Sequence, residues 1–248
     1  DYADLAVGVT GENGTGAVTV IRGGALGLNL LQRQHIFGAD LGHAGMSGDH
    51  FGAAVLIADV IGFPSAELII GAPDAEPTQG VLSSGLVYIA NSTAASIAFN
   101  GAQVLSASEA GGTLWTSGRF GAALAAGDLW GDGGTLDLAV GAPGNNAGGR
   151  VFVSRGSPLG QTWPVVLSQS AGWGMNDAGD SYGAALATGD HDGDGDDELA
   201  VGCPGQDYLL GTPDGGSIHI HDGGPAGPAA SHQVWVDADL GDEPNGEG

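Results

Sequence analysis

The densest group of chemically active side chains in this sequence is an acidic stretch that leads directly into an apolar run. It reads GDHDGDGDDELAVG from Gly189 to Gly202. Its candidate ligands stand at alternate positions of one loop: Asp190, Asp192, Asp194, Asp196 and Glu198. This alternation turns oxygen ligands inward around a hard cation, and Gly195 permits the sharp turn that such a loop requires. The spacing therefore predicts a calcium site, to which Asp196 contributes its carbonyl group.

The charge of this loop supports the same interpretation. Four carboxylates held close together repel one another unless a cation neutralises them, and a bound cation also makes the loop rigid. An EF-hand is excluded because Val201 stands where its closing glutamate is needed and because apolar strand-like runs flank the loop. A solvated acidic turn without metal remains the alternative.

A second acidic loop has a weaker version of this pattern. In GDLWGDGGTLDLAVG, Asp128, Asp132 and Asp137 keep three of the acidic positions, but Trp130 takes the third position and one residue is inserted. We predict a calcium site here too, with lower occupancy.

Two further copies of the loop have fewer acidic residues. ADVIGFPSAELIIG keeps only Asp59 and Glu67, so we expect a metal-free loop held by packing. Asp4 fits the closing position of another copy, whose earlier ligands would lie ahead of this sequence.

These loops belong to a sequence that repeats itself. One apolar motif occurs four times, as LAVGV from Leu5, LIIGAP from Leu68, LAVGAP from Leu138 and LAVGCP from Leu199. Three copies follow an aromatic-glycine run, FGAAVLIAD from Phe51, FGAALAAGD from Phe120 and YGAALATGD from Tyr182. Each of the four copies is followed by one run of a third kind, GAVTVI, GLVYIA, GRVFVS or GSIHIH, in this order along the chain. A run of a fourth kind comes next, QHIFGAD, AQVLSAS, PVVLSQS or HQVWVDA. The runs are short and lack helical periodicity, so each complete unit predicts four strands. Four-stranded units repeated around an axis form an all-β propeller, and a solenoid is the alternative.

The aromatic-glycine, acidic-loop and Gly-Ala-Pro parts, in this order, resemble FG-GAP repeats, the units of the integrin alpha-subunit propeller. The resemblance covers nearly the whole chain, although Tyr182 replaces Phe, Cys203 replaces Ala and the first motif lacks Pro. It implies that the acidic loops bind calcium. It also implies that the loops at the opposite end of the strands form a separate face.

The repeats divide the chain into one propeller segment with units at about 1–50 (partial), 51–119, 120–181 and 182–248. The first unit lacks its aromatic-glycine strand, and the sequence stops where another such strand is due. We therefore expect a longer propeller, seven-bladed as in the family, or a missing strand supplied by a further segment or another chain.

Composition limits the partners. The chain carries a net charge of -24, with five Arg and no Lys. Such acidity disfavours binding to nucleic acid or to anionic membrane surfaces, although it also serves as a general solubility device. No stretch approaches the roughly 18 apolar residues of a membrane helix.

Other chemically active residues carry weaker signals. His219 and His221 share one strand face and could bind a transition metal. Because no third ligand lies nearby in the sequence, we expect them to be ordinary surface residues instead. Cys203 fits inert packing. The sequons at Asn13 and Asn91 are candidate glycan acceptors of a secreted protein. The sequence contains no recognised catalytic motif, so we do not expect an enzyme.

The resemblance implies a calcium-stabilised extracellular or cell-surface module that binds a protein or a glycan through the loops opposite the calcium face. Trp115, Trp173 and Tyr208 on those loops are the candidate contact residues, and packing between blades is the alternative for the tryptophans. Two other functions remain open, an accessory propeller of a secreted hydrolase or lyase and a structural subunit of a surface filament.

Overall fold

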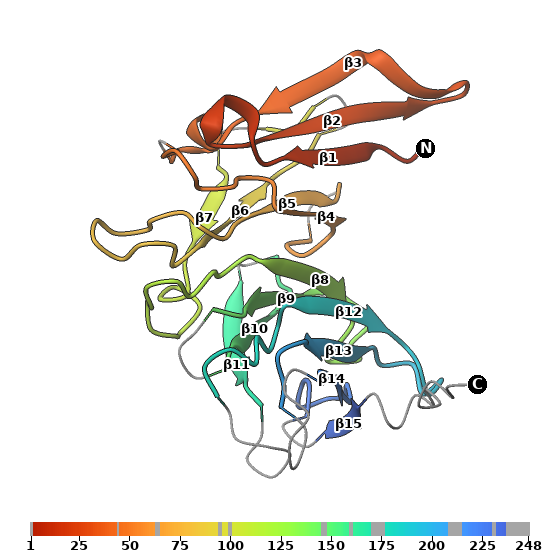
Figure 1. The fold of residues 1–248 in the computed structure, drawn as a ribbon. Helices are drawn as coiled ribbons and strands as arrows, with labels where there is room; N and C mark the ends of the chain where they lie inside the picture. Colours follow the sequence, from red (N-terminus) through yellow and green to blue (C-terminus); the bar gives the residue numbers. More distant parts are fainter. Residues whose placement is uncertain are drawn as a thin grey trace, which may run out of the picture.

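Strands dominate the fold, which forms four antiparallel sheets (Figure 1). The computed structural model describes residues 2–43, 45–62, 65–93, 96–98, 101–144, 148–158, 161–169, 177–207, 215–229 and 232–236. The first sheet contains β1 (Leu5–Val9), β2 (Ala17–Gly24) and β3 (Gly27–Ile36). The second contains β4 (Ala54–Ala58), β5 (Glu67–Ala72), β6 (Leu86–Ala90) and β7 (Gln103–Leu105). The third contains β8 (Ala123–Gly127), β9 (Asp137–Ala142), β10 (Arg150–Arg155) and β11 (Thr162–Leu167). The fourth contains β12 (Ala185–Gly189), β13 (Glu198–Cys203), β14 (Ser217–His221) and β15 (His232–Val236).

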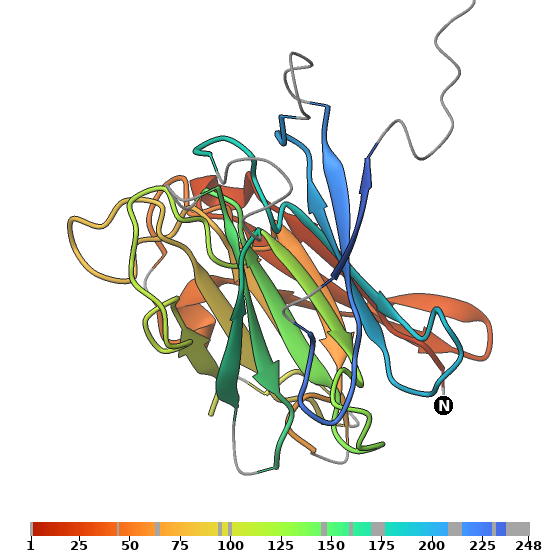
Figure 2. The same cartoon turned by 90° about the horizontal axis from the view of Figure 1, so that it is seen from below.

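Within each sheet the strands pair in chain order, as expected for propeller blades. The sheets follow one another along the molecule in Figure 1, with the first and the last at opposite ends of the row, and Figure 2 shows the same row from one end. The inner strands lie in sequence along the axis, since β4 contacts β1 and β8, and β8 contacts β12. The prediction of four-stranded blades is confirmed for the second, third and fourth sheets.

The first sheet differs from the other three. It has three strands, and β1 pairs with β2 alone among the described residues, whereas β5, β9 and β13 each have an inner neighbour as well. The expected fourth strand of this unit, QHIFGAD, is only partly extended. Its first residues end β3, and Gly38–Leu41 form a 3-10 helix, η2, capped by the Asp40 carboxylate, which accepts the Phe37 amide at 2.9 Å.

The hydrophobic core lies between consecutive sheets rather than inside any one of them. Three buried clusters fill the three interfaces, and the motif aromatics Phe51, Phe120 and Tyr182 are at most 2% exposed. Each aromatic ring packs edge-on against a ring of the third strand in its own sheet, at centroid distances of 5.0, 5.3 and 5.2 Å for Tyr88, Phe152 and His219 respectively. The repeated aromatic therefore fixes the base of each blade.

In three of the four apolar motifs, the glycine is needed where two sheets meet. A Cβ atom at Gly141 would overlap the carbonyl oxygen of Gly183, which follows the aromatic of the next sheet. Gly71 meets Gly121, and Gly8 meets Gly52, in the same way. The backbones of neighbouring sheets touch at these points, so no side chain fits between them.

The helices among the described residues are short 3-10 turns, η1 (Glu12–Gly14) and η2. Neither has the length or the hydropathy needed to cross a membrane.

Candidate metal centre

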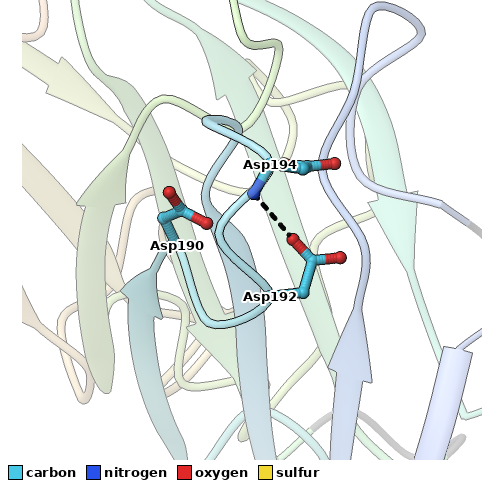
Figure 3. A group of neighbouring side chains, drawn as sticks. All are labelled: Asp190, Asp192 and Asp194. Atoms are coloured by element: carbon cyan, nitrogen blue, oxygen red, sulfur yellow. Dashed lines mark hydrogen bonds between the residues drawn. The ribbon is translucent and has the colours of Figure 1, made fainter.

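The acidic loop predicted to bind calcium connects β12 to β13 at the end of the fourth sheet. Gly193 and Gly195 adopt left-handed φ values of 82° and 103°, which side chains rarely accept. These two turns fold the loop back on itself. Figure 3 shows the consequence: Asp190, Asp192 and Asp194 stand around one turn of the backbone.

These three aspartates form the only cluster of at least three candidate ligand residues found among the residues that the structure describes. One carboxylate oxygen from each lies within 4.8 Å of the others, and all three side chains are exposed. One oxygen of each accepts a backbone amide of the loop, from Gly193 at 2.7 Å, from Asp194 at 3.1 Å and from Asp196 at 2.9 Å. Each side chain is thereby oriented while its second oxygen stays free of hydrogen bonds from the described residues. A donor set made only of carboxylate oxygens suits calcium.

The other two predicted ligands are placed differently. Glu198 is 5% exposed, and its carboxylate accepts the His191 amide at 2.8 Å. It therefore closes the base of the loop. The side chain of Asp196 lies against Gly131 in the loop of the third sheet. Partial desolvation, followed by the nearby carboxylates of Asp194 and Asp128, raises the pKa of Asp196. A cation in this loop would relieve that repulsion.

The Asp128 loop, between β8 and β9, arranges its carboxylates in another way. Both oxygens of Asp128 accept loop amides, from Asp132 at 3.0 Å and from Gly133 at 2.8 Å. Asp132 forms a salt bridge with Arg155, with a shortest distance of 2.6 Å between guanidinium nitrogen and carboxylate oxygen, and the guanidinium lowers the pKa of that carboxyl. The predicted ligands are therefore largely engaged by groups of the protein.

Asp137, the closing residue of this loop, is 2% exposed. Its two oxygens accept the amides of Trp130 at 3.1 Å and Gly156 at 2.8 Å. Burial nevertheless raises the pKa of Asp137 to about 6.

The two acidic loops lie side by side. The Asp197 carboxylate accepts the Asp128 amide at 2.8 Å, and the Asp197 amide donates to the Asp128 carbonyl at 2.9 Å. Asp197 was not among the predicted site residues. Its position beside Glu198 in the sequence gives no sign of this contact, because the partner belongs to another repeat.

The Asp59 loop of the second sheet is held by packing, as expected. Val60 and Ile61 are 0% and 4% exposed, and the Glu67 carboxylate accepts their amides at 2.9 and 3.1 Å. Burial raises the pKa of Glu67. Glu67, Asp137 and Glu198 thus share one structural role, since each binds backbone amides at the base of its loop.

The remaining sequence candidates are placed as follows. Trp115 is 37% exposed and lies in the segment that precedes β8, whereas the Asp128 loop follows β8, so the two occupy opposite ends of that strand. Trp115 also lines a cavity of about 10 Å³ together with Phe120 and Phe152, which is too small for a ligand. Trp173 and Tyr208 lie outside the described residues.

The expectation that His219 and His221 are surface residues was wrong. They are 0% and 1% exposed. The Tyr182 hydroxyl and His221 Nε2 are 2.6 Å apart, and Ser217 Oγ lies 2.9 Å from His219 Nε2. The pair faces the core, where His219 takes the place of the third-strand aromatic of the second and third sheets. Cys203 is buried as expected, and burial raises the pKa of its thiol to about 12.

The two sequons differ in exposure. Asn13 is exposed on η1, whereas the side-chain oxygen of Asn91 is buried without a hydrogen-bond partner among the described residues.

The stacked four-stranded sheets, the aromatic-glycine contacts and the acidic hairpin define a class of protein. The family model of the FG-GAP repeat matches residues 182–221, from the motif aromatic through the acidic loop to the end of β14. Residues 182–221 therefore form an FG-GAP repeat.

The chain's relatives include two integrin alpha chains. It is 31% identical over 228 residues to integrin alpha-PS2 of Drosophila melanogaster, covering 84% of this chain and 14% of that protein. It is 32% identical over 166 residues to integrin alpha-8 of Mus musculus, covering 63% of this chain and 15% of that protein. The chain thus spans a small fraction of the length of these relatives.

Proposed function

We propose that this chain is a calcium-binding propeller module of an extracellular, integrin-alpha-like recognition protein. The observation that carries the proposal is the convergence of Asp190, Asp192 and Asp194 with oxygens within 4.8 Å. The salt bridges among the described residues supply none of the three with a basic partner. A calcium ion provides the missing positive charge, and its ligands are deprotonated carboxylates, as the site offers.

The residues of this loop would divide the work. Asp190, Asp192 and Asp194 would hold the ion through their free oxygens. The carbonyl group of Asp196 and the carboxylate of Glu198 are further candidate ligands. Glu198 would first have to give up its hydrogen bond from the His191 amide. The ion would supply no catalytic chemistry here. It would cross-link the hairpin and, through Asp197, stabilise the contact with the Asp128 loop.

Thermal unfolding tests this proposal. A ligand at one hundred times its Kd stabilises the folded state by about 2.7 kcal/mol, which raises the Tm of a chain of this size by roughly 5–10 °C. We expect that shift on replacing chelator with calcium. Asp192→Asn should abolish it, and the matched control Glu12→Gln, an exposed acidic residue on η1, should retain it. A wild-type Tm that does not respond to calcium would contradict the proposal.

We further propose that the module recognises its protein or glycan partner through the loops opposite the acidic hairpins. The support is the exposure of Trp115 at that end and the similarity to integrin alpha chains. Partner capture on a protein or glycan array tests it. Trp115→Ala should lose binding at an unchanged Tm if this side chain contacts the partner, whereas a lowered Tm with retained binding would assign it to packing.

The two alternative functions separate by experiment. An accessory propeller of a secreted hydrolase or lyase requires a catalytic partner domain, so an activity screen on a longer natural polypeptide distinguishes it. A filament subunit requires self-assembly, which sedimentation velocity detects. We favour recognition of a protein or glycan partner because the two relatives reported above are integrin alpha chains. We propose no enzymatic role for residues 1–248.

We also propose that another FG-GAP repeat packs against the fourth sheet. Gly202 occupies the register position of Gly141, since each pairs with the first residue of the inner strand of its sheet. The three atoms nearest to a Cβ added at Gly202 all belong to Ala185 of its own sheet, whereas the nearest atom at Gly141 belongs to the backbone of the next sheet. Beside it lies a groove of about 300 Å³, partly lined by Ala187, Ala200 and Ile220. The aromatic-glycine strand of a further repeat would pack against this face of the fourth sheet. Such strands pack in the same way against the first, second and third sheets.

Hydrogen exchange tests this packing. In a polypeptide that carries a further repeat after residue 248, the amides around Gly202 should exchange at least tenfold more slowly than in residues 1–248 alone. Equal exchange in both would contradict the proposal.

A further inference from the structure

A salt bridge in the third sheet stands where the fourth sheet has unpaired acidic charge. Arg155 Nε and Nη2 lie 3.2 and 2.6 Å from the same oxygen of Asp132. The guanidinium carbon also lies 5.9 Å from the ring centroid of Trp130, which replaces the acidic residue at the third loop position. The loop therefore contains an internal cation that is held by both an acidic and an aromatic side chain.

Strand register gives the position of Arg155 an equivalent in every sheet. The residue before it, Ser154, pairs with Leu138, the first leucine of the apolar motif. In the other sheets the residues paired with that leucine are Ile21, Ala90 and His221. The residues that follow them are Arg22 in the first sheet, Asn91 in the second and Asp222 in the fourth.

The first sheet has a related ion pair, in which the arginine contacts the closing residue instead of a residue within the loop. Arg22 Nη1 lies 2.7 Å from Asp4, the residue at the closing position of that acidic loop. The following residue, Gly23, donates its amide to the other oxygen of Asp4 at 2.9 Å, as Gly156 does to Asp137 at 2.8 Å. The same position thus supplies a guanidinium to a carboxylate that precedes the apolar motif in two of the four sheets.

The other two sheets fit the same rule. The second sheet has Asn91 and a loop with only Asp59 and Glu67, where little negative charge requires compensation. The fourth sheet has Asp222, which adds negative charge beside the loop with the three convergent aspartates. The neighbouring Gly223 lies directly against the backbone of Asp197, so this position is next to the acidic loop.

From these four sheets we infer that the residue at the Arg155 position decides whether an acidic loop binds calcium. An arginine there serves as the built-in cation of the loop and excludes the metal, so the Asp128 loop is metal-free. An acidic residue there leaves the loop dependent on calcium. The inference deepens the proposed calcium function and refines the prediction of a second, weaker site at Asp128, Asp132 and Asp137.

Calcium titration by isothermal calorimetry on residues 1–248 tests the inference. We expect one ion per wild-type chain and two per Arg155→Gln chain, the second with a Kd in the range of about 10⁻⁴–10⁻³ M that is typical of extracellular sites. Arg155→Lys, which keeps the charge, and Arg33→Gln, which removes an exposed arginine elsewhere, should each bind one. Adding Asp132→Asn to Arg155→Gln should remove the second ion. A folded Arg155→Gln chain that binds the same number of ions as the wild type would overturn the inference.

A reciprocal variant covers the case in which Arg155→Gln does not fold. Asp222→Arg should weaken calcium binding by the Asp190 loop at least tenfold, whereas Asp222→Asn should change it less than threefold. Unchanged affinity in Asp222→Arg would contradict the inference. The two proposals fail separately. No ion in the wild type and one in Arg155→Gln would refute only the calcium site at Asp190. One ion in both chains would refute only the role of Arg155.

Discussion

Replacing Gly141 by Ala tests whether backbone contact between sheets explains the repeated glycine. The new Cβ atom would overlap the Gly183 carbonyl oxygen, lie 3.1 Å from the Gly183 carbonyl carbon and lie 3.3 Å from the Ala123 Cβ atom. Gly183 cannot yield easily, because it follows the fully buried Tyr182 in a left-handed turn with φ of 88°. The neighbouring sheet must therefore move.

The expected cost follows from two opposing effects. Overpacking costs about 1–3 kcal/mol, and the upper end applies because rigid backbone is displaced. Ala in a strand recovers about 0.5–1 kcal/mol relative to Gly. We expect a net loss of about 2 kcal/mol, or a Tm lowered by roughly 4–8 °C.

Gly202→Ala is the matched control within the same chain. Gly202 has the same register position, but the three atoms nearest to an added Cβ all belong to Ala185 of its own sheet, the nearest being the Ala185 Cβ atom at 3.2 Å. We expect an unchanged Tm or an increase of about 2–4 °C. Circular dichroism melts of the two variants and the wild type measure this difference. Equal destabilisation by both substitutions, or none by Gly141→Ala, would refute the packing argument.

Two further predictions concern buried polar groups. Burial raises the pKa of Asp137 from 3.8 to about 6, so its contribution to stability is fully present below about pH 3.8 and is lost as pH rises through about 6. Asp137→Asn should therefore flatten the pH dependence of the unfolding free energy, measured with urea in chelator between pH 4 and 7. An unaltered pH dependence would contradict this. Tyr182→Phe should lower the unfolding free energy by about 0.5–1.5 kcal/mol, because it removes the hydrogen bond between the buried Tyr182 hydroxyl and His221 Nε2, whereas Tyr88→Phe should cost less than about 0.5 kcal/mol; equal losses would argue against the hydrogen bond.

The sequence predicted the architecture well because the repeated motifs record local requirements. Phe51, Phe120 and Tyr182 recur because each fills the base of a blade, and the glycines recur because neighbouring backbones touch. The spacing of Asp190, Asp192 and Asp194 likewise predicted their convergence, because a short hairpin keeps alternate side chains close together. These features depend on residues near one another in the chain.

Features that depend on contacts between distant segments were missed. The pairing of Arg155 with Asp132 requires the register of β9 and β10, and the contact of Asp197 with Asp128 requires two repeats to lie side by side. His219 looked like a surface residue because its type is polar, whereas its register position, equivalent to Phe152, places it in the core. Aligning the repeats by strand register would have revealed this equivalence.

A crystal structure of the chain grown with calcium, with anomalous difference density calculated at a wavelength where calcium scatters anomalously, tests the central claim most directly. The account predicts one peak in contact with the carboxylates of Asp190, Asp192 and Asp194, and none at the Asp128 loop, where the Arg155 guanidinium pairs with Asp132. The absence of a peak at the Asp190 loop under saturating calcium, or the presence of a peak at the Asp128 loop, would contradict it.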